Sequence, residues 1–446
     1  MCAFERWSFQ VNQDGSSTGW NNPGMSSFTT SRLMGLAREC IQNSLDAATD
    51  SGDPVVVKFS ETEILKNQLP GWKSLRDQLE LCHEQMGDQS TDSQNEIKAA
   101  RKLISKDRFN VFKVEDSGTV GLEGPCETEK PFYVYVKSSG TSNAEAGAGS
   151  HGLGKNAPLC MSDLRTIFVA TNWKNSGGDL CSLIQGRSTL MSVKNRDGAM
   201  MSEMGFCGKN FDPVTVDEIS DDFEWLKPGP RVGTSIFVVG FETTSTLHWW
   251  KTIIVAALST YFAAIHRKKL VVQIYHDSGD HIIDHDTIEK WFTNTEIINY
   301  VEYGTEEVDS KQLSNAHEYY NLLKRNDNDE HCLIKEFEIL ELGKCVLKMI
   351  VGSDGNYDLP SRVAIVRRDM LITDQMKKFW LHPQPSNKPF VGVFECLDEA
   401  GNDFLRRMEP PRHNDLDAMQ LSPVSQSDGK KALKDLGEQL KKFVKE

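Results

Sequence analysis

The sequence predicts an α+β fold in each of two successive domains. Its 446 residues leave room for two or three domains. Segments with strand-like alternation are interleaved with helical segments along the whole chain. Hydrophobic residues make up 39% and charged residues 26%, which is typical of a folded globular protein. We therefore expect an N-terminal arm at 1–29, a first domain at 30–243, a second domain at 244–425 and a C-terminal helix at 426–446.

The first domain is predicted to open with a helix that begins near Thr30 or Ser31, both good N-caps. Residues 70–105 are polar with helical spacing, which indicates a helical insertion. Residues 137–150 are rich in Ser, Gly and Ala and predict a mobile loop. Another helix is expected from about Leu153. The predicted strands cover 54–64, 110–115, 131–136, 166–171 and 234–240.

The second domain is predicted to open with an apolar helix at 246–265. Its apolar run is interrupted by Ser259 and Thr260 and is shorter than the roughly 20 residues that span a bilayer. Trp249 and Trp250 are expected to anchor this helix to the first domain. The remaining predicted elements are a hairpin at 276–283, a helix capped by Asp286, strands at 336–341, 344–351 and 362–367, and an amphipathic helix at 430–446.

Charge and cysteine content exclude several functional classes. Fifty basic against sixty-four acidic residues give a net charge of −14, which argues against coating nucleic acid or anionic lipid by bulk charge. The ten cysteines form no Cys-x-x-Cys pair, so neither a zinc finger nor a disulfide framework is supported. The N-terminus lacks a charged-then-apolar signal pattern. We expect a cytoplasmic protein with no membrane partner.

One predicted helix, Leu36 to Ala48, carries three polar or acidic side chains on a single face. Glu39, Asn43 and Asp46 lie at about 0°, 40° and −20° around the helix axis. The apolar stripe lies on the opposite side and contains Leu33, Ala37, Ile41, Ser44 and Ala48. Such a polar face on an isolated helix is usually solvated, so other segments must decide whether it binds a ligand.

Two further segments combine glycines with a charged side chain. Asp116 ends a predicted strand and is followed by Gly118 and Gly121, which let the backbone approach a ligand, although an ordinary turn has the same composition. Residues 147–157 form a glycine-rich stretch that opens a helix. Its backbone N–H groups and Lys155 would favour phosphate, although a flexible linker has a similar composition.

The glycine-rich stretch is not a P-loop, because Asn156 stands where that motif has Ser or Thr. A fourth segment, Gly233-Thr234, opens a predicted strand and carries little information alone.

Taken in this order, the four segments resemble the GHKL superfamily of ATPases. Its members include the DNA gyrase B subunit, the ninety-kilodalton heat-shock chaperones, histidine kinases, and the MutL and MORC proteins. The string from Glu39 to Ala47 is most similar to MutL, while 20–24 and 405–413 resemble stand-alone bacterial ATP-binding members. The resemblance covers residues 20–240 and implies a Bergerat-type α/β sandwich ATPase domain, followed by a transducer-like α/β domain.

The resemblance assigns a role to each matching residue. Glu39 would be the general base that activates the attacking water, and Asn43 would supply its amide oxygen to Mg²⁺. Asp116 would accept a hydrogen bond from the adenine amino group, supported by Thr234.

Further ATP contacts are implied for Asp46, Gly118, Gly121, Ser150, Gly152, Leu153, Gly154 and Lys155. Residues 137–150 would form a lid over ATP. A basic residue of the second domain would contact the γ-phosphate; Arg367 or Arg368 is expected, with Lys344 as a further candidate.

The implied function is an ATP-gated dimerising switch with slow ATP hydrolysis. We expect a homodimer on ATP binding, an effector protein partner and a role in bacterial DNA transactions or anti-phage defence, with DNA as a further partner. A chaperone-like ATPase that clamps a client, and a nucleotide sensor that does not hydrolyse, remain alternatives. The 38 residues before Glu39 contain no histidine, which argues against the usual layout of a histidine kinase.

Overall fold

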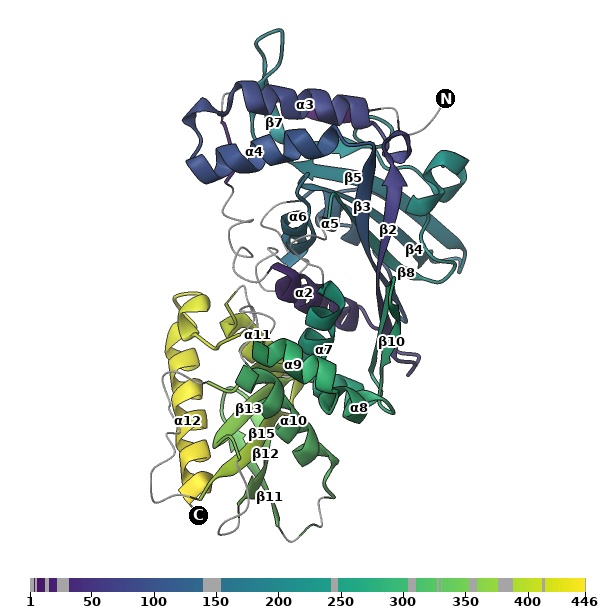
Figure 1. The fold of residues 1–446 in the computed structure, drawn as a ribbon. Helices are drawn as coiled ribbons and strands as arrows, with labels where there is room; N and C mark the ends of the chain where they lie inside the picture. The colour runs from purple at the N-terminus through teal and green to yellow at the C-terminus, as the bar shows by residue number, and fades with distance from the viewer. Residues whose placement is uncertain are drawn as a thin grey trace. The chain divides into compact units, whose positions relative to one another are not determined.

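The computed structural model describes residues 4, 6–12, 16–21, 32–138, 154–241, 248–303, 310–326, 329, 331–352, 359–375, 388–410 and 414–445 (Figure 1). Contacts divide the chain into two compact units. Unit 1 comprises Met1–Thr252 and Val271–Ile282, and unit 2 comprises Ile253–Leu270 and Ile283–Glu446. The predicted helix start at Thr30 or Ser31, nearly all of the predicted loop at 137–150 and much of the predicted arm lie outside the described residues.

Unit 1 is built on a ten-stranded sheet with the order β1-β7-β5-β4-β8-β3-β2-β9-β10, in which β6 pairs with β7. Its strands are β1 (Trp7–Val11), β2 (Val55–Leu65), β3 (Arg108–Ser117), β4 (Thr166–Lys174), β5 (Leu180–Thr189), β6 (Val193–Lys194), β7 (Met200–Cys207), β8 (Gly233–Val239), β9 (Leu270–His276) and β10 (Gly279–Ile283). The structure confirms the predicted strands that correspond to β2, β3, β4 and β8, and the predicted hairpin. Strands β1, β5 and β7 were not predicted.

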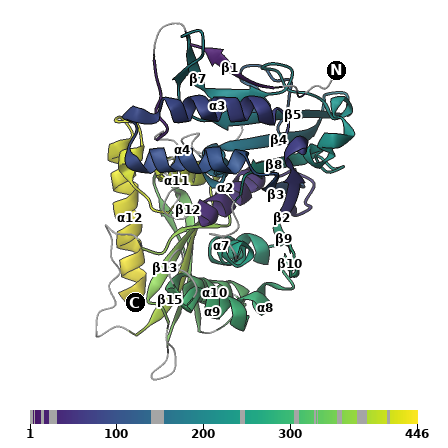
Figure 2. The same ribbon diagram turned by 45° about the horizontal axis from the view of Figure 1, so that its top comes forward.

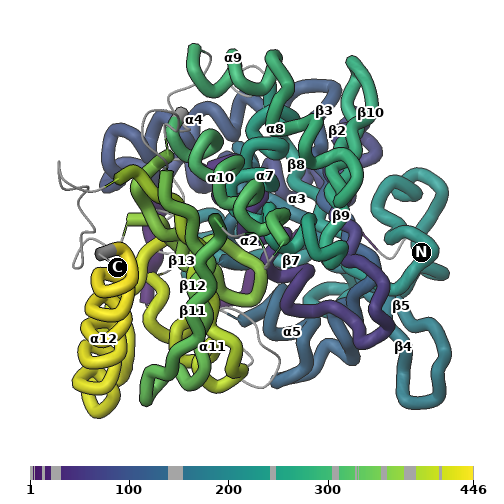
Figure 3. Tube along the Cα trace, turned by 90° about the horizontal axis from the view of Figure 1, so that it is seen from below, coloured from purple at the N-terminus to yellow at the C-terminus, as the bar shows by residue number. Residues whose placement is uncertain are grey.

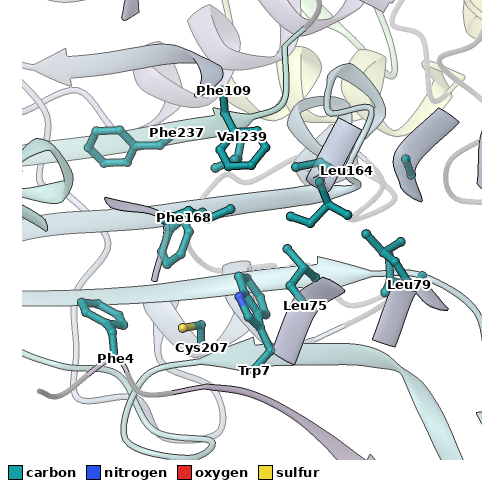
Figure 4. Packing of buried hydrophobic residues seen from close by; sticks show 14 of the residues in the cluster. Phe4, Trp7, Leu75, Leu79, Phe109, Leu164, Phe168, Cys207, Phe237 and Val239 are labelled. Atoms are coloured by element: carbon teal, nitrogen blue, oxygen red, sulfur yellow. The ribbon is translucent and has the colours of Figure 1, made fainter. Parts of the chain in front are cut away.

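The register defines two faces of this sheet. Phe168 lies opposite Phe237, and Val111 lies opposite Val239, so these side chains share one face with Phe109, which we call the insertion face. The predicted helical insertion is confirmed as α3 (Trp72–Glu84) and α4 (Thr91–Ile104). It buries Leu75 and Leu79 in the same hydrophobic cluster as the strand residues of the insertion face (Figure 4). Ile97 of α4 belongs to the same cluster.

The opposite face, which we call the α2 face, carries Asp116 and Val57, which pair across β3 and β2. It contacts α2 (Arg32–Asp46) and α6 (Ala157–Met161), which is preceded by the short 3-10 helix η3 (Gly154–Asn156). The sheet of unit 1 therefore has helices on both faces. In Figure 2 the insertion helices α3 and α4 run beside each other across the sheet.

The prediction of a strand at 131–136 is wrong, because this segment forms the helix α5 (Pro131–Val136). Its aromatic and β-branched residues favour a strand by propensity. However, Pro131 occupies the first turn of a helix, where its missing N–H is no loss. Phe132 and Val136 are the buried residues, and their spacing of four fits one face of a helix.

Unit 2 contains a five-stranded sheet with the order β11-β12-β15-β13-β14. Its strands are β11 (Cys332–Ile339), β12 (Gly343–Val351), β13 (Arg362–Arg367), β14 (Met370–Thr373) and β15 (Phe390–Cys396). The helices are α7 (Trp249–His266), whose first turn belongs to unit 1, α8 (Ile288–Phe292), α9 (Thr295–Tyr303), α10 (Ser310–Lys324), α11 (Glu399–Met408) and α12 (Gln426–Lys445). The predicted α+β class is therefore confirmed.

Two predicted helices of unit 2 are confirmed by their packing. The C-terminal helix α12 runs beside the sheet of unit 2 (Figure 3). It buries Leu433, Leu436 and Leu440, and the centroid of the Phe443 ring lies 5.2 Å from that of Phe337 on β11. The apolar helix is α7, and Trp249 at its start donates a hydrogen bond to Glu61 of β2 at 2.9 Å. None of the described helices is both long enough and apolar enough to cross a membrane.

Candidate functional site

Asp116 is the centre of a hydrogen-bond network at the end of β3. Its Oδ1 accepts hydrogen bonds from the Thr119 hydroxyl at 2.6 Å and from the Thr234 backbone N–H at 3.0 Å. Its Oδ2 lies 3.1 Å from the hydroxyl of Ser44 on α2. Burial raises the pKa of the Asp116 carboxyl, while these three donors oppose the shift because they stabilise the charged form. The network joins α2, β3 and β8 at one carboxylate.

The turn after Asp116 requires its two glycines. Gly118 has a φ of +77°, and a Cβ there would lie 2.7 Å from the Pro54 carbonyl oxygen. Gly121 has a φ of +71°, and a Cβ there would lie 2.3 Å from the Asn172 carbonyl oxygen. Because glycine has no side chain, both residues let this turn pack closely against neighbouring backbone. The turn is also tied to the end of α2, because the Val120 N–H donates to Ala47 O at 2.9 Å.

Helix α2 presents its predicted polar residues away from the sheet. Ser44 faces the sheet through its contact with Asp116, and Glu39, Asn43 and Asp46 lie on the other side of the helix. Glu39 is nevertheless only 6% exposed, while Asn43 and Asp46 are half-buried. The predicted set of one amide and two carboxylates is thus carried on one face of α2.

The glycine-rich segment approaches Glu39 of α2 closely at Gly154. A Cβ on Gly154 would lie 1.9 Å from Glu39 Oε2, which is closer than any real contact. The backbone at 154 therefore lies directly against the Glu39 carboxylate, and any side chain at 154 would displace that carboxylate. Ser150, Gly152 and Leu153 lie outside the described residues, as does nearly all of the predicted lid.

Lys155 was expected to direct its charge at phosphate, and this role stays a prediction. Its ammonium is buried and donates to the Val134 carbonyl oxygen of α5 at 2.7 Å. Burial, with a smaller contribution from nearby Arg187, lowers the Lys155 pKa from 10.5 to about 8. In this structure Lys155 thus links η3 to the end of α5.

Sequence reasoning missed Arg187, which lies on β5 and is 3% exposed. It donates to the Asn156 side-chain oxygen at 3.2 Å and to Tyr135 O at 3.4 Å, and burial lowers its pKa to about 10. Its side chain therefore fixes the end of the glycine-rich segment to the sheet. A basic residue within the otherwise uncharged run Leu183–Leu190 was the available signal.

Arg367 and Arg368 lie in unit 2, and each is part of an ion pair. The buried Arg367 pairs with Glu409, which is also fully buried. Arg368 pairs with Glu399 and, at 3.1 Å, with Asp403. A γ-phosphate contact from either arginine stays a prediction.

The donor atoms on α2 are compatible with a magnesium ion. Asn43, Glu39 and Asp46 offer only oxygen ligands, and Mg²⁺ prefers oxygen and keeps several of its waters. Across the described residues, no group of three or more His, Cys, Asp and Glu side chains could hold a metal by itself. A magnesium ion here would therefore depend on water and ligand oxygens in addition to Asn43.

A hollow of about 330 Å³ lies at the same end of β3. Its lining includes Lys58, Glu115 and Ser235. Glu115 lies opposite both Lys58 and Ser235 in the register, so these three lining side chains are on the insertion face. Asp116 and Gly233 also line the hollow, so it adjoins the Asp116 network.

No protein-family model and no curated protein matches the sequence. Among solved structures, the chain is similar to the ATPase domain of Thermus thermophilus gyrase B in complex with an aminocoumarin, with 11% identity, a TM-score of 0.33, and coverage of 92% of this chain and 84% of that one.

The ATP-binding domain of Francisella tularensis topoisomerase IV, in complex with a small-molecule inhibitor, is 9% identical, with a TM-score of 0.36 and coverage of 96% of both chains. The gyrase B subunit of Myxococcus xanthus is 9% identical, with a TM-score of 0.33 and coverage of 92% and 88%. The DNA gyrase B subunit is one of the GHKL members that the sequence motifs resemble.

Proposed function

We propose that this protein binds ATP together with Mg²⁺ and hydrolyses it. The observation that supports this most strongly is the Asp116 network, which connects residues from α2, β3 and β8 that are far apart in sequence. A carboxylate offers about four acceptor positions, and three donors lie near Asp116. One position is thus left for an N–H donor such as the adenine amino group.

The contact between Gly154 and Glu39 supports phosphate binding beside α2. Backbone N–H groups at a glycine-rich segment that opens a helix can hold phosphate oxygens. Asn43, four residues after Glu39, is the residue on α2 that would hold Mg²⁺ through its amide oxygen. The bound ion would offset phosphate charge during transfer.

Glu39 is proposed to act as the general base. Its carboxylate would orient a water molecule and accept a proton from it as the water attacks the terminal phosphate. Its burial excludes competing bulk water and keeps the carboxylate fixed against the backbone of Gly154.

Titration calorimetry with a non-hydrolysable ATP analogue and Mg²⁺ tests this proposal. We expect saturable binding to the wild-type protein and to Glu39→Gln, whereas only the wild type releases phosphate from ATP. A folded wild-type protein that takes up no adenine nucleotide would contradict the proposed function. Equal phosphate release by both proteins would contradict only the role of Glu39.

We further propose that ATP binding drives the formation of a homodimer that signals to an effector protein in DNA transactions or anti-phage defence. The MutL-like string from Glu39 to Ala47 supports this reading. ATP can shift such an equilibrium only by binding the dimeric state more tightly. Light scattering with and without the ATP analogue tests dimer formation, and a mass that the analogue leaves unchanged would contradict it.

A further inference from the structure

Gln42 is a buried amide for which the described structure provides no hydrogen bond. Its side chain is on α2 and the residue is only 5% exposed. Both its Nε2 and its Oε1 are inaccessible to solvent, and neither has a hydrogen-bond partner among the described residues. Buried polar groups in native proteins are nearly always paired, because an unpaired one forfeits its hydration. An amide that lacks both partners therefore needs an explanation.

The position of Gln42 on α2 suggests that explanation. It lies three residues after Glu39 and four before Asp46, so it belongs to the same row of side chains along the helix. Its direction is about −60° from Glu39, on the side of the helix away from Ser44 and the sheet. Gln42 is thus a neighbour of the residues to which we assign the reacting end of the nucleotide.

The two unpaired atoms also define the chemistry of the missing partner. The NH₂ group needs an acceptor and the carbonyl oxygen needs a donor. A phosphate group with its bound water offers both, since phosphate oxygens only accept and water can donate. An apolar ligand or an isolated cation would leave at least one of the two atoms unpaired.

We propose that Gln42 is a nucleotide-binding residue that donates its amide N–H to a phosphate oxygen and accepts a hydrogen bond from a water on that phosphate. This inference rests on the proposed function and adds a contact that the sequence motifs did not assign. The described residues leave this amide unpaired in the free protein, and the bound nucleotide would satisfy it.

The substitution Gln42→Leu separates this role from a structural one. Leucine has a similar volume and needs no hydrogen bond, so the ligand-free variant should unfold about 2 °C or more above the wild type. Its dissociation constant for the ATP analogue with Mg²⁺ should rise about tenfold, because the phosphate contact is lost. Its affinity for adenosine, which has no phosphate, should remain unchanged.

Gln78→Leu is the matched control. Gln78 is 7% exposed on α3, its Nε2 also lacks a partner among the described residues, and α3 packs on the insertion face. This variant should leave the affinity for the ATP analogue unchanged.

Three results would overturn the inference: unchanged binding of the analogue by Gln42→Leu, an equal loss of affinity for adenosine, or a lower unfolding temperature of the ligand-free variant. In each of these cases a wild type that binds ATP leaves the proposed function intact. A wild type that binds no nucleotide would overturn both proposals.

Discussion

Asp116 and Glu39, the two candidate carboxylates, have different surroundings. Asp116 is surrounded by donors from three elements, which fix its carboxylate and leave little freedom for another orientation. Glu39 lies against a glycine backbone. Sequence analysis proposed both carboxylates as site residues, because the segments that carry them resemble motifs of the GHKL ATPases. It could not identify Ser44 or Thr119 as partners of Asp116, because these contacts depend on how α2 and the turn lie on the sheet.

Replacing Asp116 should test recognition of the base. Asp116→Asn turns one acceptor oxygen into a donor, so we expect at least about a tenfold loss of affinity for ATP. Calorimetry with ATP and with GTP should show that the loss is specific to adenine. Glu115→Gln is the control, because Glu115 is the next residue on β3 and points to the insertion face. Equal losses in both variants would count against base recognition by Asp116.

Replacing Gly154 should test the close approach of the backbone to Glu39. The added methyl group of Gly154→Ala would occupy the position of Glu39 Oε2. We expect phosphate release to fall at least about a hundredfold while the protein remains folded, since a displaced base loses its alignment. Gly87→Ala is the control, because no atom lies within 4 Å of the Cβ it would introduce. Normal turnover by Gly154→Ala would show that Glu39 is not held in this position.

At the scale of elements, the sequence revealed those whose pattern is local. The helical insertion, α2 and α12 have clear apolar periodicity, and the structure confirms them. Strand β7 was missed because most of its residues are only half-buried and do not alternate. Helix α5 was predicted as a strand because Val134 and Tyr135 have high strand propensity, whereas packing of Phe132 and Val136 decides its state. Pairings between distant strands cannot be derived from such local signals.

The link between η3 and α5 should make stability depend on pH. The Lys155 pKa is about 8 in the folded protein, below its ordinary value of 10.5. Between these values the unfolded chain binds more protons at this group, so its contribution to the free energy of unfolding increases as the pH rises from about 8 to 10.5.

The increase expected from Lys155 is at most roughly 3 kcal/mol. Chemical unfolding of wild type and Lys155→Met across this range should show the wild type gaining stability relative to the variant. Lys174→Met, at an exposed position, is the control. Its free energy of unfolding should differ from that of the wild type by the same amount at every pH in this range. A constant difference for Lys155→Met as well would contradict the lowered pKa.

At the scale of the whole molecule, unit 2 depends on a buried charge pair. Arg367 and Glu409 are 2% and 0% exposed, and they join β13 to the residue that follows α11. Removing one partner leaves the other charge buried and unpaired, which is strongly destabilising. Such a contact cannot be read from the sequence, since the two residues are separated by 42 positions.

We therefore expect Glu409→Ala to lower the free energy of unfolding by about 3–5 kcal/mol. Glu399→Ala removes the exposed partner of Arg368 and should change it by less than about 1 kcal/mol. Denaturant unfolding followed by fluorescence measures both. If both variants lost a similar free energy of unfolding, the buried Arg367–Glu409 pair would contribute no more to stability than the exposed pair.

The path of the chain between the two units limits how this protein can be dissected. After Thr252 the chain enters unit 2, and it returns at Val271 to add β9 and β10 beside β2 before it leaves again at Ile283. A fragment that stops at residue 243 would therefore end its sheet at β2, whose outer N–H and C=O groups would be open to other chains. Such a fragment should self-associate on purification, whereas one that extends through β10 retains its natural edge strands.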